Sequence, residues 1–108
     1  MPRFSIHAIC RHQDFDRDPI YLEARLLDDG RLNPNGVVGY YADGDGQVAI
    51  THIIDDVVYF ADDSAWDTNL LRRKIEPGAE FSIGDDIEGR NGEDYWVYRI
   101  DDVREITE

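Results

Sequence analysis

Short segments in which apolar and polar residues alternate recur along the chain, and this period of two constrains the fold more than any other feature. Between residues 3 and 11, the apolar positions include Phe4, Ile6, Ala8 and Cys10. Successive side chains of a β-strand point to opposite faces, so a period of two predicts a strand with one buried face. The first segment is therefore expected to be a half-buried strand.

Further alternating segments, and runs rich in β-branched and aromatic residues, predict more strands separated by turn-forming residues. They lie at residues 20–27, 37–42, 47–54, 57–60, 80–83, 95–100 and 103–106. The Gly-rich stretch Asp43-Gly44-Asp45-Gly46 predicts a hairpin turn between two of them. We predict a mainly β fold, α+β at the margin, built as a small antiparallel barrel or sandwich of about six to eight short strands. The alternation argues against a parallel α/β sheet, because the strands of such sheets are continuous apolar runs.

One short helix is predicted near residues 64–74. Ser64 and Asp67 have the spacing of a capping box, and Trp66 and Leu70 are four residues apart, which places them on one helical face. Basic residues follow near the expected C-terminal end, where the helix dipole favours positive charge. We expect this helix to pack across one end of the β-structure.

The length of 108 residues fits one acidic, β-rich domain covering residues 1–108. The N-terminal sequence lacks the apolar segment of a signal peptide, and no apolar run approaches the roughly 20 residues that span a bilayer. Cys10 is the only cysteine, which excludes an internal disulfide and fits a reducing compartment. We therefore expect a cytoplasmic protein without a membrane partner.

The charge balance is strongly acidic, with 24 acidic and 11 basic residues and a net charge of −13. This balance argues against direct binding of nucleic acid or anionic membranes, because both require cations on the protein. An acidic surface attracts basic surfaces and accelerates encounters with them. Solubility, or the amino-acid usage of the source, explains the same charge without any partner.

Five aspartate doublets fall at the ends of the predicted strands. They are Asp28-Asp29, Asp55-Asp56, Asp62-Asp63, Asp85-Asp86 and Asp101-Asp102. Several doublets on one face would imitate the regularly spaced phosphates of a nucleic acid, whereas dispersed doublets are ordinary solvated turns. Tyr95 is expected to point outward, as an exposed tyrosine typical of interfaces. The candidate partner-binding residues are Asp55, Asp56, Asp85, Asp86, Tyr95, Asp101 and Asp102.

Motifs for catalysis or metal binding are weak. His7, Cys10 and His12 come closest to a metal or nucleophile cluster, but on a strand His7 points away from the other two. A calcium loop starting at Asp43 would need a glutamate at its twelfth position, which is Ile54. The sequence has no P-loop, GxGxxG, GxSxG or HExxH motif. We expect no cofactor, no metal and no enzymatic activity.

The leading hypothesis is a non-catalytic acidic binding protein that engages a basic protein surface. Inhibitors of the anti-CRISPR or anti-restriction type and immunity partners of nuclease toxins are acidic proteins of this kind. The alternative is a small-molecule or sugar-binding β-barrel module, in which aromatic side chains would line a pocket. A hydrolase or isomerase with two aspartates in a cleft is a third class, which no residue spacing supports.

Overall fold

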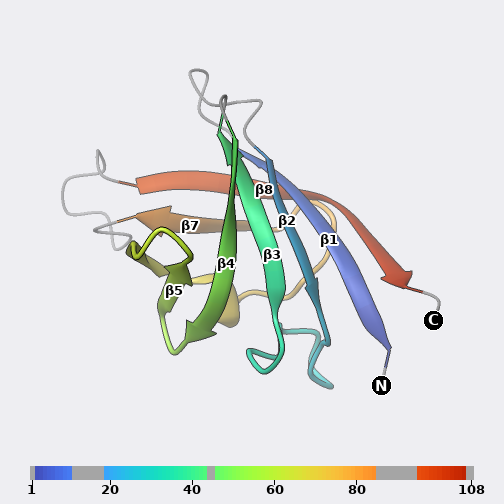
Figure 1. Cartoon of the computed structure of the whole chain (residues 1–108). Coiled ribbons are helices and arrows are strands. Elements are labelled where there is room, and N and C mark those ends of the chain that lie inside the picture. The colour runs from blue at the N-terminus through green and yellow to red at the C-terminus, as the bar shows by residue number, and fades with distance from the viewer. Residues whose placement is uncertain (1, 11–18, 44–45, 85–94, 107–108) are drawn as a thin grey trace.

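Eight antiparallel strands close into a barrel in the computed structural model, which describes residues 2–10, 19–43, 46–84 and 95–106. Each strand pairs with its neighbours in sequence, and the first pairs with the last (Figure 1). The strands are β1 (Arg3–Cys10), β2 (Pro19–Ala24), β3 (Val38–Asp43), β4 (Gly46–Ile54), β5 (Val57–Phe60), β6 (Ala65–Thr68), β7 (Glu80–Gly84) and β8 (Tyr95–Ile106). The mainly β prediction is confirmed, and the architecture is the barrel.

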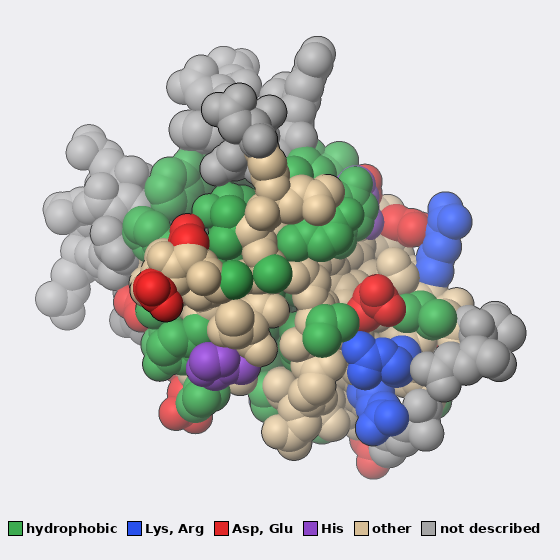
Figure 2. Space-filling model, in the orientation of Figure 1, with side chains coloured by type: hydrophobic (Ala, Val, Ile, Leu, Met, Phe, Trp, Pro, Cys, Tyr) green, Lys and Arg blue, Asp and Glu red, His purple; other side chains and the backbone are tan. Residues whose placement is uncertain are grey.

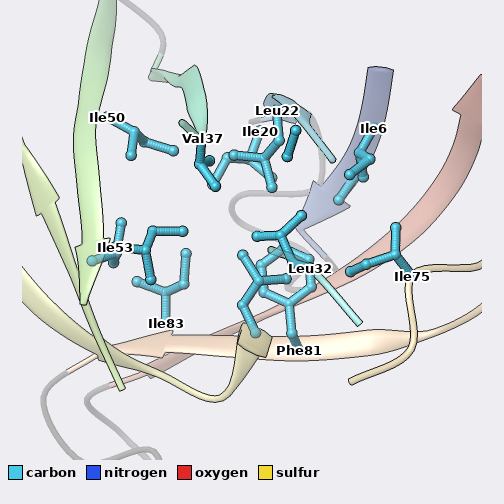
Figure 3. Close-up of a cluster of buried hydrophobic side chains, with 14 of the residues drawn as sticks. Ile6, Ile20, Leu22, Leu32, Val37, Ile50, Ile53, Ile75, Phe81 and Ile83 are labelled. Atoms are coloured by element: carbon cyan, nitrogen blue, oxygen red, sulfur yellow. The ribbon is translucent and has the colours of Figure 1, made fainter. Parts of the chain in front are cut away.

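The inward-facing side chains fill the barrel interior. In β1, Ile6, Ala8 and Cys10 are buried at every second position, as the alternation predicts. Side chains from the other strands meet them, including Leu22 and Phe81 (Figure 3). Complete burial of one such aliphatic or aromatic side chain contributes about 1.5–3 kcal/mol. The core is therefore assembled from positions that the period of two identifies.

Two loops close one end of this barrel. Leu32, Val37 and Ile75 are buried, although they lie outside the strands. The Ile75 amide donates a hydrogen bond to the Gly30 carbonyl oxygen at 2.9 Å, which ties the β2–β3 loop to the segment before β7. These loops shield the apolar interior from water at the end where β1 begins.

The segment predicted as a helix is mostly strand. Ala65–Thr68 forms β6, and one turn of 3-10 helix, η2, covers Leu70–Arg72. The Ser64 hydroxyl and amide both donate to Asp62 Oδ1, so this residue belongs to the β5–β6 turn and caps no helix. Pairing of β6 with β5 and β7 outweighs the four-residue spacing of Trp66 and Leu70. In the described segments, no helix has the length and apolar character needed to cross a bilayer.

A single 12-residue strand, β8, replaces the two short strands predicted at residues 95–100 and 103–106. His7 pairs with Asp102 and Ala8 with Ile100, so Asp101 is the extra residue of a β-bulge. Ile100 faces inward before the bulge and Val103 packs against the core after it. Asp101-Asp102 therefore lies within one strand, and the expectation that this doublet separates two short strands was wrong.

Candidate functional site

A row of aromatic rings crosses the outer surface of the barrel. His7 on β1 pairs with Tyr21 on β2, which pairs with Tyr40 on β3. The ring centroids of His7 and Tyr21 are 4.6 Å apart, and those of Tyr21 and Tyr40 are 5.0 Å apart. The three rings point outward because their neighbours Ile6, Leu22 and others occupy the inward face.

A second aromatic pair lies on the outer surface of the next two strands, β4 and β5, at a bulge in β4. The bulge falls between Ile50 and His52, and it allows Thr51 and His52 both to be exposed. The His52 ring stacks on Tyr59 of β5 with a centroid distance of 4.4 Å. We call the outward residues His7, Tyr21, Val38, Tyr40, His52 and Tyr59 the outer aromatic wall.

The hydrogen bonds of Thr51 fix the tautomer of His52. The Thr51 hydroxyl donates to the Tyr59 carbonyl oxygen at 3.1 Å, and its oxygen lies 3.0 Å from His52 Nδ1. A hydroxyl has a single hydrogen, so Nδ1 must be the donor to Thr51. The neutral ring therefore presents Nε2 as an acceptor. The Thr51 hydroxyl is already committed to a backbone oxygen, which argues against its use as a nucleophile.

The outward positions of β1 to β5 carry few fixed charges, although 32% of the chain is charged. Among the described outward positions on these strands, only Arg3 and Glu23 bear one. Figure 2 views this side of the barrel, where hydrophobic side chains gather in the upper part of the view and adjoining acidic and basic side chains lie at the lower right. Tyr21 is 37% exposed and Val38 is 49% exposed. An uncharged, aromatic area of this kind on a highly charged protein is typical of an interaction surface.

Glu23 is the carboxylate that lies inside this uncharged area. It pairs across the strands with Ser5 on β1 and Val38 on β3, and it is exposed. Arg3 Nη2 donates to the backbone oxygen of Glu23 at 3.2 Å rather than to its carboxylate. In the described structure the carboxylate has neither an ion-pair nor a hydrogen-bond partner.

The bulge in β8 places two carboxylates at the edge of the outer aromatic wall. His7 Nδ1 donates a hydrogen bond to Asp101 Oδ1, and Arg104 Nε lies 2.7 Å from Asp102 Oδ2. The two aspartate side chains are 40% and 45% exposed, so the His7–Asp101 hydrogen bond and the Arg104–Asp102 ion pair are both surface interactions. Surface ion pairs contribute only about 0–1 kcal/mol, so an incoming cation can exchange with them at little cost.

The remaining predicted site residues lie elsewhere or outside the described residues. Asp55 and Asp56 form the β4–β5 turn, three strands around the barrel from β8, and Arg72 makes a two-bond ion pair with Asp56. Asp85 and Asp86 are outside the described residues. The backbone of Tyr95 begins β8, and its side chain is outside the description.

Two aspartates in turns have a lowered pKa. The Arg31 backbone amide donates to Asp29 Oδ1 at 3.1 Å and, with the Arg31 guanidinium, lowers the pKa of Asp29. The hydroxyl and amide of Ser64 lower the pKa of Asp62. Each hydrogen bond favours the ionised carboxylate. These groups stabilise turns at opposite ends of the barrel and do not belong to the outer aromatic wall.

A depression of about 370 Å³ lies beside the loop before β7. Its lining consists of Arg73, Lys74, Glu76, Gly78, Ala79 and Glu80. It holds no aromatic ring and none of the predicted site residues, so it does not match the pocket expected for a sugar-binding module. No group of three or more His, Cys, Asp or Glu side chains in the described segments is arranged to hold a metal ion.

The sequence contained a signal for two of the site residues that were not predicted. Alternation through Ile20 and Leu22 places Tyr21 and Glu23 outward. The run from Val37 to Ala42 does not alternate, so the outward position of Tyr40 follows from its pairing with Tyr21. Their proximity depends on strand order and register, which alternation does not provide. Glu23, the single carboxylate beside the aromatic row, belongs to no aspartate doublet.

Comparisons with models of known protein families, with curated proteins and with solved structures gave no match to this chain.

Proposed function

We propose that the protein is a non-catalytic acidic binding protein of the cytoplasm that engages a basic protein surface through the outer aromatic wall. The observation that carries this proposal is the nearly uncharged aromatic area on β1–β5 of a chain with net charge −13. The Glu23 carboxylate lies inside this area, and those of Asp101 and Asp102 lie at its edge. An aromatic centre with charges around it is the usual composition of a protein interface.

Electrostatics give the proposed interface its preference for a basic partner. The net charge repels other acidic proteins and steers basic ones toward the surface, most strongly at low salt. Tyrosine rings then supply the short-range binding energy, because they bury a large area and attract cations over their faces. An inhibitor or immunity protein that covers the cationic site of a nucleic-acid enzyme would work by these two steps.

A pull-down from the source lysate tests this function. The native chain should retain a basic protein at low salt, and high salt or added DNA should release it. Tyr40→Thr should abolish retention, because it removes a ring of the wall without changing charge. The matched variant Leu27→Thr changes another exposed apolar residue, away from the wall, and should retain the partner.

One charge variant with four substitutions completes the test. Neutralising Asp85, Asp86, Asp101 and Asp102 together should weaken retention. The proposal fails if retention survives both this variant and Tyr40→Thr, or if nothing is retained at low salt.

A further inference from the structure

Closure of the barrel restricts how any partner can bind to the wall. Every strand is hydrogen-bonded to a neighbour on both sides, and β1 pairs with β8 along its whole length from Arg3 to Cys10. A peptide cannot therefore add a strand to the sheet along any of β1 to β5, where the wall lies. Recognition on this surface must come from side chains.

Four outward side chains form a square on β2 and β3, three of them from the outer aromatic wall and the fourth that of Glu23. Tyr21 lies opposite Tyr40, and Glu23 lies opposite Val38, on the adjacent strands β2 and β3. Opposite Cβ atoms of such pairs are about 4.5–5.5 Å apart, and successive outward residues of one strand are about 7 Å apart. A group about the size of a guanidinium can therefore touch the rings and the Glu23 carboxylate together.

We infer that this square, consisting of Tyr21, Glu23, Val38 and Tyr40, is the recognition site for an arginine side chain of the basic partner. The inference rests on the proposed function and names the chemistry that the surface selects. The unpartnered Glu23 carboxylate accepts two N–H bonds from the guanidinium, whose plane then lies against a tyrosine ring. Val38 packs against the aliphatic stem of the arginine.

Arginine fits this site better than lysine for physical reasons. A guanidinium is planar, weakly hydrated and able to stack on a ring while it forms two hydrogen bonds to one carboxylate. An ammonium group is a strongly hydrated point charge, so contact with Tyr21 and Tyr40 would cost it water without allowing the paired bonds. Net charge alone would attract both residues equally, so a preference for arginine separates this site from general attraction.

Two tripeptide probes test the inference on the intact chain by NMR titration. They are acetyl-Gly-Arg-Gly-amide and acetyl-Gly-Lys-Gly-amide, which carry the same charge. The arginine probe should shift the resonances of Tyr21, Glu23, Val38 and Tyr40 and bind about tenfold more tightly than the lysine probe. Glu23→Gln should remove that preference. Asp28→Asn, which removes one charge from the β2–β3 loop, should preserve it.

The outcomes separate the inference from the proposed function. Equal shifts with both probes, or an unchanged preference in Glu23→Gln, would overturn the arginine site while leaving a basic partner in place. Shifts by the arginine probe at other surfaces only would also overturn it. If neither probe shifts the wall and the pull-down variants retain the same proteins as the native chain, both proposals fail.

Discussion

At the scale of single residues, Gly39 sets the distance between β2 and β3 and hence the geometry of the wall. A Cβ atom at this position would lie 2.0 Å from the Tyr21 carbonyl oxygen and 3.0 Å from the Leu22 Cα. These are backbone atoms, so neither can move aside alone. The absent side chain allows β3 to approach β2 closely where the Tyr21 and Tyr40 rings lie beside each other, tilted by 39°.

Gly39→Ala should therefore destabilise the protein and disturb the wall. We expect the free energy of unfolding to decrease by about 1–3 kcal/mol, the cost typical of overpacking. Urea denaturation measures this loss. Gly46→Ala is the matched control, because an added Cβ there has no neighbour within 4 Å, and it should change stability by less than about 0.5 kcal/mol. Equal stability of the two variants would contradict the close approach.

The lowered pKa of Asp62 predicts a dependence of stability on pH. The folded-state pKa lies below the unfolded value of 3.8, so the contribution of this group is present above that value. It is lost as the pH falls through the folded pKa. Asp62→Asn keeps an acceptor for Ser64 but does not titrate, so its stability should decrease less steeply below pH 3.8.

Thermal unfolding followed at a series of acid pH values measures the effect, which should be small because Asp62 is exposed. Asp63→Asn removes the same charge one residue along the turn, and its melting temperature should fall with decreasing pH as steeply as that of the native chain. If the melting temperature of Asp62→Asn fell equally steeply, this would contradict the role assigned to the hydrogen bonds of Asp62.

At the scale of secondary-structure elements, the bulge in β8 serves the surface rather than the core. Removal of Asp101 would leave Ile100 inward, Asp102 outward and Val103 inward, which is regular alternation. The bulge adds one outward carboxylate beside His7 without altering the inward face. Bulges of this kind redirect side chains and are frequent near functional sites.

Two single-residue deletions test this interpretation. Deletion of Asp101 should preserve the β-sheet circular dichroism spectrum and cooperative unfolding, with a modest loss of stability. Deletion of Ile100 should prevent folding, because regular alternation would then direct Asp101 into the core in place of a fully buried isoleucine. If both deletions unfold the protein equally, the bulge is required for barrel closure and this account of β8 is wrong.

Most elements of the fold could be predicted from the sequence, because alternation reports burial directly. It correctly identified the inward face of β1 and the hairpin between β3 and β4. It could not identify β6, because the spacing of Trp66 and Leu70 also fits a helix. The strand conformation of this four-residue segment is determined by its pairing with β5 and β7. The bulge at Asp101 was missed because the register with β1 is a tertiary property.

The candidate site was less predictable than the fold. Charge indicated a basic partner, and Asp101 and Asp102 do border the outer aromatic wall. However, the doublets within the described residues are dispersed: Asp55 and Asp56 lie at a distant turn, and Asp62 and Asp63 lie at the other end of β5. Tyr21, Glu23 and Tyr40 belong together only because β2 and β3 are adjacent in this register. Sequence alternation gives the face of each residue but not its neighbours on other strands.

At the scale of the whole molecule, a net charge of −13 on 108 residues opposes the compact state by self-repulsion. Added salt screens this repulsion, since the Debye length decreases from about 10 Å at 0.1 M to about 3 Å at 1 M. The melting temperature should therefore rise by several degrees between low and high sodium chloride. Choline chloride should give the same rise, because screening does not depend on the cation. A melting temperature independent of salt would contradict net self-repulsion.

The most direct test of the outer aromatic wall compares the affinity of its variants for the basic partner recovered from the pull-down. Calorimetry at low and high salt would measure Kd for the native chain, Tyr40→Thr and Leu27→Thr. We predict that Tyr40→Thr raises Kd by about 30-fold or more at both salt concentrations, as expected for a tyrosine at an interface centre. Leu27→Thr should bind like the native chain. Equal affinity of all three proteins would contradict the wall as the binding surface and leave net charge as the sole source of attraction.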